Sequence, residues 1–251
     1  MYLPGRGATL DRSHPLARGL ISYWPFLEAT GDKLQDINRQ NVGTLTGMDP
    51  ATDWIGSGQG MALDFDGTND YVATGLSLAS RPAFTLSGWV ARRASNSLVY
   101  LSGDGGNQVQ IGFFSDGNVY VSIDGANFFS TASNSTSLIH VVLTYDGAGA
   151  TKLRFYINGV QVTLSGDTAL TTTHASAGNL DIGRRNTGSL FTDGRITRVG
   201  VWDRKLETAE IVELCRNSNW WIHRPSPGRF SFEEAAAAAT NHFLLLLGAG
   251  S

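Results

Sequence analysis

The sequence predicts an all-β protein, and three observations support this. Thirty glycines and seven prolines, among many threonine, serine and asparagine residues, are typical of a chain rich in turns. Segments with a two-residue hydrophobic period recur from LISYWPF (20–26) to ITRVGVW (196–202), separated by short turn signals. A hydrophobic content of 41% in 251 residues suffices for the core of one large β domain.

Two hairpin regions are the clearest predicted elements. In LTYDGAGATKLRFYINGVQV (143–162), Leu153, Phe155 and Ile157 follow the two-residue period of a half-buried strand, with YDGAG and NG as turn signals on either side. A further hairpin is expected in VQIGFFSDGNVYVSID (109–124), with SDGN as its turn. Both regions indicate antiparallel sheet structure.

A single short helix is expected in LETAEIVELCRN (206–217), where apolar residues and glutamates alternate at helical spacing. The hydrophobic periodicity then divides the chain into three parts. Residues 1–18 are expected to form an N-terminal arm, residues 19–217 the β domain, and residues 218–251 a C-terminal arm.

The C-terminal arm contains a segment, 232–247, that could form a helix. Ser231 with Glu234 fits a capping box, and the following alanines have high helix propensity. The end of this helix would be apolar on all sides and would have to be buried, which points to assembly with another chain. The assembly residues are Phe243, Leu244, Leu245, Leu246 and Leu247. A tail packed on its own domain, a mobile tail and a β-strand through HFLLLL remain as alternatives.

Charge and cysteine content exclude several classes of partner. The formal net charge of −3 provides no positive surface for nucleic acid or an anionic membrane, so neither partner is expected. No run of about 20 apolar residues, the length that spans a bilayer, occurs. The N-terminal segment lacks the apolar run of a signal peptide. Cys215 is the only cysteine, so an intrachain disulfide is excluded and folding in a reducing cytoplasm is expected.

Four segments, taken in order, resemble the laminin G-like, concanavalin A-like jelly-roll domains. They are ALDFDGTNDYV (62–72), FTLSGWVARR (84–93), HVVLTYDGAGATKLRFYINGVQV (140–162) and LDIGRRNTGSLFTDGRITRVGVWDRKLETAEI (180–211). The resemblance covers roughly Gly19 to Arg216. It implies a jelly-roll sandwich of two antiparallel sheets packed face to face. Function does not follow from such a fold and needs its own argument.

Catalysis is not expected from this sequence. Some relatives of the fold are glycoside hydrolases, which need two carboxyl groups beside the scissile bond. None of the glutamates lies on a confidently predicted strand, and Glu207, Glu210 and Glu213 belong to the expected helix. The lone Cys215 is expected to be a small buried apolar residue rather than a nucleophile. We therefore predict that the protein is not an enzyme.

The resemblance implies one possible metal site and no other cofactor. Many family members hold a structural calcium ion, and the matching loop DINRQNVG places one ligand at Asp36. A second acidic residue is usual in the late strand, where this sequence has Thr197 and Arg198. Loss of that charge predicts a degenerate site. The alternative for Asp36 is a residue that caps a turn.

Glycan binding requires aromatic platforms and planar hydrogen-bonding groups on an exposed rim. Three loop segments offer them: SGDGGNQ, GANFFS and GRRNTGS. The candidate residues are Asp104, Asn107, Phe128, Phe129, Arg184, Arg185 and Asn186. Each has a plain structural alternative: a hairpin turn for GDGGN, one core ring for FF, and a solvated loop for RRN.

The predicted function is that of a non-catalytic structural protein of a virus particle, either a capsid decoration protein or a tail or fibre component. Laminin G-like domains mostly work outside the cell, whereas this sequence lacks a signal peptide and disulfides. A virion protein is assembled in the host cytoplasm and released by lysis, so it could work outside the cell without a signal peptide or disulfides. The sequence also resembles laminin G-like proteins of tailed bacteriophages. Expected partners are further copies of the chain, other virion proteins and surface glycans. The alternatives are a carbohydrate-binding lectin-like module outside any virus particle and a glycoside hydrolase.

Overall fold

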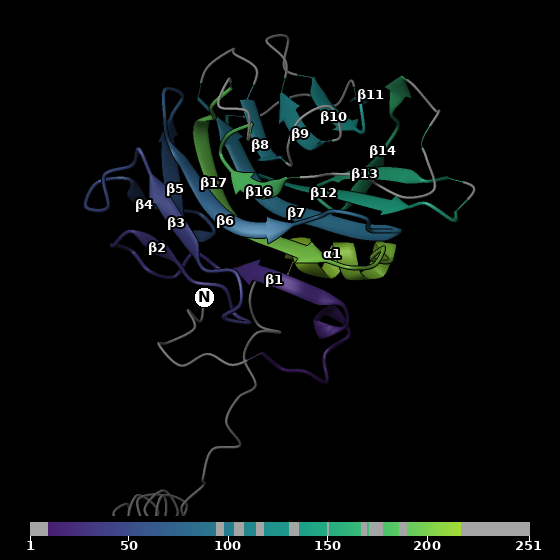
Figure 1. Ribbon diagram of the computed structural model, residues 1–251, viewed down its shortest axis with the longest axis horizontal. Helices are drawn as coiled ribbons and strands as arrows, with labels where there is room; N and C mark the ends of the chain where they lie inside the picture. Colours follow the sequence, from purple (N-terminus) through teal and green to yellow (C-terminus); the bar gives the residue numbers. More distant parts are fainter. Residues whose placement is uncertain are drawn as a thin grey trace, which may run out of the picture.

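The computed structural model describes residues 10–93, 98–102, 108–113, 118–130, 136–149, 151–166, 170, 178–185 and 190–216. Within these residues the chain forms two antiparallel β-sheets packed face to face, which confirms the predicted jelly-roll sandwich (Figure 1). The predicted C-terminal helix at 232–247 and the assembly residues 243–247 lie outside the described residues.

The first sheet has eight strands in the order β14-β13-β12-β7-β17-β5-β4, with β1 paired to β17 beside this path. The strands are β1 Leu20–Trp24, β4 Trp54–Ser57, β5 Gly60–Asp66, β7 Ala83–Arg92, β12 Ile139–Asp146, β13 Leu153–Ile157, β14 Val160–Val162 and β17 Asp193–Trp202. The hairpin region predicted at 143–162 lies in β12, β13 and β14. Leu143 pairs with Phe155, and Phe155 pairs in turn with Val162.

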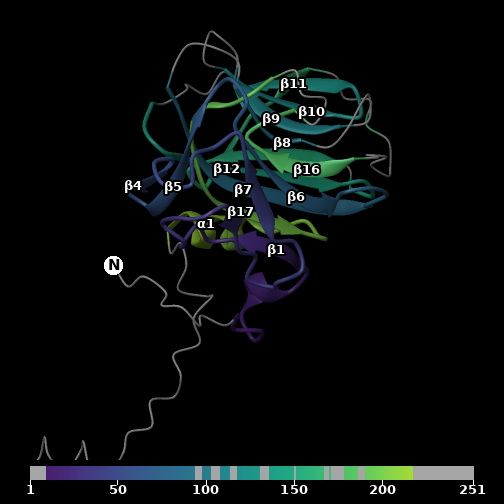
Figure 2. The same cartoon turned by 60° about the vertical axis from the view of Figure 1, so that its left-hand side comes forward.

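The second sheet has nine strands in the order β15-β11-β10-β9-β8-β16-β6-β3-β2. The strands are β2 Lys33–Leu34, β3 Gly43–Thr46, β6 Tyr71–Ser77, β8 Leu98–Ser102, β9 Val109–Phe113, β10 Val119–Ile123, β11 Ala126–Ser130, β15 Ser165–Gly166 and β16 Asn179–Ile182. The hairpin predicted at 109–124 is β9–β10, in which Val119 pairs with Phe113. Figure 2 shows β11, β10, β9, β8, β16 and β6 in succession.

The hydrophobic core lies between the two sheets and follows from the two-residue period of the strands. Leu86 and Val90 of β7 and Val109 and Ile111 of β9 belong to one cluster, and all of these side chains are buried. Each fully buried aliphatic side chain of this size contributes about 1.5–3 kcal/mol relative to exposure. The residues between them point away from the core, so each sheet also has an outward face.

The outward face of the eight-stranded sheet is closed by a second hydrophobic cluster. Helix α1 (Thr208–Arg216) confirms the helix predicted at 206–217 and lies with β1 beneath β7 and β12 in Figure 1. The 3-10 helix η1 (Pro15–Ala17) contributes Leu16. The buried members are Leu16, Tyr23, Val142, Tyr156, Trp202, Leu206, Ile211 and Leu214.

The described part of the N-terminal arm is packed onto the sandwich. Trp202 Nε1 donates a hydrogen bond to the Leu16 carbonyl at 2.7 Å, and Arg204 donates to the carbonyls of Pro15 and Arg18 at 3.0 and 2.8 Å. Residues 15–18 therefore belong to the domain that they precede. No helix in the described part of the chain is long and apolar enough to span a membrane.

Candidate functional site

The outward face of the nine-stranded sheet carries a group of polar side chains. In β9 and β10 the residues Val109, Ile111, Val121 and Ile123 belong to the core, so the residues between them face outward. Strand pairing places outward positions from six neighbouring strands in one transverse row. From β6 to β11 this row is Ala73, Asp181, Ser102, Gln110, Ser122 and Asn127.

Gln110 of this row belongs to a hydrogen-bonded network of four side chains. Gln110 Nε2 donates to Gln108 Oε1 at 2.6 Å, and Arg185 Nε donates to the same oxygen at 3.1 Å. The Tyr120 hydroxyl donates to Gln110 Oε1 at 3.3 Å. Each amide is thus oriented by its neighbours before any ligand arrives.

The network leaves hydrogen-bonding capacity unused. No described residue accepts a hydrogen bond from Gln108 Nε2, and the buried Ser122 hydroxyl has no partner among the described residues. A buried polar group without a partner costs about 1–3 kcal/mol. A polar ligand that supplies the missing partners would recover part of this free energy.

The residues at the bottom of this face are enclosed, although they point away from the core. We call them the polar floor, and their exposed fractions are 9% for Gln108, 3% for Gln110, 7% for Tyr120, 2% for Ser122 and 3% for Asp181. Burial raises the pKa of Tyr120 to about 12, although the charge of Arg185 opposes this shift. The hydroxyl is therefore protonated at neutral pH and remains a hydrogen-bond donor.

Beside the polar floor lies a second group, the arginine rim, formed by the partly exposed residues Tyr71, Arg184 and Arg185. Arg184 Nε donates to Asp181 Oδ2 at 2.7 Å, and its guanidinium carbon lies 3.4 Å from the centroid of the Tyr71 ring. Burial raises the pKa of the Asp181 carboxyl, while the hydrogen bond and charge of Arg184 oppose this. The rim is the accessible part of the site.

The backbone after β16 determines the position of the two rim arginines. Gly183 has a φ of 93°, and a Cβ at this position would lie 2.3 Å from the Phe65 ring, so only glycine fits. Two residues later, the Arg185 backbone N–H donates to the Leu190 carbonyl at 2.8 Å. The chain is therefore held on both sides of the rim arginines.

The glycan-binding residues predicted from the sequence differ in where they lie in the structure. Arg184 and Arg185 lie in the site. The prediction that Phe128 lies on an exposed rim is wrong, because its side chain is 6% exposed and packs in the core. Phe129 pairs with Tyr120 across β10 and β11. The remaining candidates, Asp104, Asn107 and Asn186, lie outside the described residues.

The sequence prediction missed the polar floor. Its members occupy the outward positions of strands such as VQIGF (109–113) and VYVSI (119–123), whose other side chains are core residues. That alternation was visible in the sequence. It is equally typical of any sheet with one solvated face, however, and therefore did not single out a binding site.

Asp36, the predicted calcium ligand, caps a turn. Its Oδ1 accepts the Tyr23 backbone N–H at 3.0 Å, and its Oδ2 accepts the N–H groups of Gln40 and Asn41 at 3.2 and 3.1 Å. These bonds occupy both oxygens of a carboxylate that is buried. Among the described residues no group of three or more His, Cys, Asp or Glu side chains could hold a metal ion.

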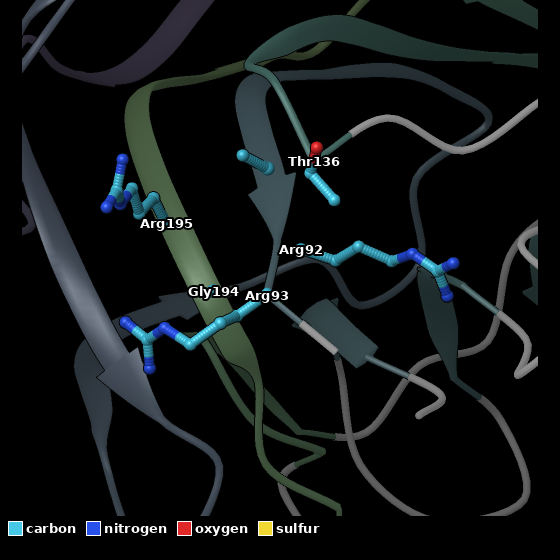
Figure 3. A pocket seen from close by; sticks show the side chains of 6 residues that line it. Arg92, Arg93, Thr136, Gly194 and Arg195 are labelled. Atoms are coloured by element: carbon cyan, nitrogen blue, oxygen red, sulfur yellow. The ribbon is translucent and has the colours of Figure 1, made fainter. Parts of the chain in front are cut away.

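A cavity of about 160 Å³ lies elsewhere, where β7 ends and β17 begins. It is lined by Ala91, Arg92, Arg93, Thr136, Gly194 and Arg195. Figure 3 shows Arg92 pointing away from Arg93 and Arg195, so the three guanidinium groups do not converge on one ligand. Arg93 also pairs with Asp64 and Asp193. Despite its volume, the cavity is a weaker candidate than the polar floor.

Comparison with solved structures shows the same sandwich in other proteins. Sialidase from Trypanosoma rangeli in complex with sialic acid matches 81% of this chain with a TM-score of 0.60 and 16% identity. The chain spans about a third of that enzyme's length, with 34% covered. Domain 4 of a GH43 extracellular arabinanase from Geobacillus stearothermophilus, in complex with arabinotriose, matches over 78% of this chain and 98% of its own, with a TM-score of 0.59 and 14% identity. At such identities the likeness shows the fold alone.

Sequence comparison gives the family. A search among curated proteins finds no significant match. A family model described as the concanavalin A-like lectin/glucanases superfamily matches residues 66–212, which include the strands of the polar floor and the arginine rim. The match covers more than half of the chain and confirms the family resemblance of the four sequence segments. The chain therefore belongs to the concanavalin A-like lectin/glucanases superfamily.

Proposed function

We propose that this protein is a non-catalytic carbohydrate-binding module that holds saccharides on the polar floor and the arginine rim. The observation that carries the proposal is the hydrogen-bonded network of Gln108, Gln110, Tyr120 and Arg185. Sugar hydroxyls both donate and accept hydrogen bonds, and amide side chains can meet them with a donor and an acceptor at once. Because the network already orients these groups, little ordering free energy is lost on binding.

The choice between the two outward faces supports this site. The face of the eight-stranded sheet is covered by α1 and η1, and its cluster is hydrophobic. The polar floor of the nine-stranded sheet instead offers Gln108 Nε2 and the Ser122 hydroxyl without partners among the described residues. The arabinanase domain, solved with arabinotriose, is a sandwich of comparable size and is consistent with a saccharide ligand.

We propose further that no bond is broken at this site. Glycoside hydrolysis requires a pair of carboxyl groups about 5–9.5 Å apart around the scissile bond. Among the polar floor and rim residues only Asp181 has a carboxyl group, and Arg184 binds it. Glu210 and Glu213 belong to α1, over the opposite sheet. These placements support binding without turnover.

Calorimetric titration tests the proposal, with saccharides first selected on a glycan array. Tyr120→Phe and Gln108→Ala should each weaken binding about 3- to 10-fold, because a neutral hydrogen bond contributes about 0.5–1.5 kcal/mol. Gln161→Ala is the matched control, since Gln161 is an exposed glutamine on β14 of the other sheet. Binding to no saccharide on the array, or unchanged affinity in both floor variants, would reject the site. Release of reducing ends from a bound saccharide would reject the absence of catalysis.

On the sequence alone, we propose that this module is carried on the surface of a virus particle, as a capsid decoration protein or as a tail or fibre component. The resemblance to laminin G-like proteins of tailed bacteriophages supports this. The single cysteine, Cys215, also suits a sandwich that folds without disulfides. A lectin-like module outside any particle is the alternative, and the polar floor would serve either role.

A further inference from the structure

The two arginines of the rim differ in how their charges are compensated. Arg184 is paired with Asp181 and stacked on Tyr71. Arg185 uses only Nε, which donates to the neutral amide oxygen of Gln108. No carboxylate among the described residues forms an ion pair with Arg185. The rim therefore retains one positive charge that the described part of the protein does not neutralise.

The geometry of Arg185 leaves its most specific binding edge available. Because Nε is held by Gln108, the guanidinium plane is oriented, while no described residue accepts a hydrogen bond from Nη1 or Nη2. These two nitrogens form a fork that matches the two oxygens of a carboxylate. Gln108 Nε2 lies on the same amide that receives Arg185 Nε and is a further donor beside the fork.

We propose that the site selects acidic saccharides, and that Arg185 binds the carboxylate of a uronic acid-type residue through Nη1 and Nη2. The inference rests on the proposed carbohydrate-binding function and adds the chemical class of the ligand. The neutral part of the saccharide lies over the polar floor, where Gln108 Nε2 and the Ser122 hydroxyl meet hydroxyl groups. Arg184 does not serve as a second anion site, because the Asp181 carboxylate already compensates its positive charge.

The test compares probes that differ in their acidic group. Trigalacturonate, its methyl ester and a sulfated trisaccharide without carboxyl groups are titrated into the full chain by calorimetry. We expect trigalacturonate to bind about 10- to 100-fold more tightly than its methyl ester, since the ester cannot form the charge-assisted pair. Arg185→Gln should abolish this preference, and Arg185→Lys should restore only part of it because lysine has no fork. Arg154→Gln is the matched control, an arginine on β13 of the opposite sheet.

The possible outcomes separate this inference from the function on which it rests. Equal affinity for the acid and its ester, or a preference that survives Arg185→Gln, overturns acid selection while saccharide binding stands. Tighter binding of the sulfated probe than of trigalacturonate overturns the carboxylate assignment. Failure of all three probes, together with binding of neutral array saccharides that Tyr120→Phe weakens, rejects the acidic class alone. Failure of every saccharide rejects both proposals.

Discussion

At the residue scale, His140 shows how strongly the closed face of the eight-stranded sheet acts on a titratable group. Its Nε2 lies 2.9 Å from Ser87 Oγ, and its ring centroid is 5.2 Å from that of Trp89. Burial, and secondarily the charge of Arg198, lowers its pKa from 6.5 to about 3. The folded protein therefore keeps a neutral imidazole across the pH range in which the unfolded chain takes up a proton.

We expect this histidine to make folding pH-dependent. The folded pKa lies below the unfolded one, so its contribution is complete above about pH 6.5 and is lost as pH falls toward 3. Between pH 7.5 and pH 5 the wild-type free energy of unfolding should fall by about 2 kcal/mol more than that of His140→Gln. Urea denaturation at both pH values measures the difference. Equal losses in the two proteins would contradict a depressed pKa.

Asp70, which titrates in the opposite direction, does not disturb this comparison. Burial raises its pKa from 3.8 to about 6, so its contribution favours the folded state at low pH and is lost as pH rises toward 6. Both proteins carry Asp70, and its effect cancels in the difference between them. The contribution of His140 to the pH dependence of the free energy of unfolding can therefore be measured alone.

Asp36 leads to a prediction about calcium. Its oxygens already accept backbone N–H groups, so we expect millimolar calcium to leave Tm unchanged. Asp36→Ala should lower Tm equally with and without calcium, because it leaves the buried Tyr23 N–H without its partner, at about 1–3 kcal/mol. Thermal unfolding with calcium and with a chelator provides the measurement. A large calcium-dependent rise that disappears in Asp36→Ala would show that an ion binds there.

At the element scale, β17 is long enough to pair with two strands, β5 and β1, along the same edge. Residues 193–196 pair with β5, and residues 199–202 pair with β1. At the irregularity between them, Arg198 has a φ of 52° and donates to Gln59 Oε1 at 2.7 Å. Left-handed backbone is unfavourable for such a residue, and the pairing on both sides holds it in place. Burial also lowers the pKa of Arg198.

The packing of the N-terminal arm gives a prediction for one element. Leu16 of η1 is fully buried in the second hydrophobic cluster. Leu16→Ala should reduce the free energy of unfolding by about 2–5 kcal/mol, the usual range for a buried leucine. The control is Val160→Ala, because Val160 is 67% exposed and its truncation should cost less than about 0.5 kcal/mol. Equal effects in the two variants would mean that the arm is not part of the folded domain.

At the scale of the whole molecule, the two outward faces of the sandwich have different chemistry. One is covered by α1 and η1, which close a hydrophobic cluster, whereas the other carries the polar floor and the arginine rim. With this asymmetry, one face contributes to the stability of the domain and the other carries the proposed saccharide site. Any contact with further chains would have to use other surfaces or the arms.

The proposed assembly through the C-terminal arm has its own test. Deletion of residues 231–251 removes Phe243–Leu247, the apolar end of the expected helix, which we propose packs against another chain. We expect the truncated protein to keep the Tm of the full chain and to lose its oligomers in native mass spectrometry. The full chain is the control. An unchanged oligomeric state would leave the segment without a role in assembly.

The local pattern of residues was enough to predict much of the fold. The two-residue period and the glycine- and asparagine-containing turns predicted β9–β10 and β12–β13, and the spacing of apolar residues predicted α1. These elements depend on contacts between residues near each other in the chain. The family was predictable for the same reason, since several such elements occur in a specific order.

The candidate site is formed by residues that lie far apart in the sequence, and no local pattern predicts that they meet. Gln110, Ser122 and Asp181 lie in one row only because β16 reaches β9 and β10 through β8, an order set by the packing of the two sheets. A shift of one residue in register would move Phe128 from the core to the outward face, so its place could not be predicted from the sequence. Periodicity and turn chemistry determined the fold and its hairpins. Tertiary structure alone decided which polar residues meet, because a binding site is a property of strand order and register.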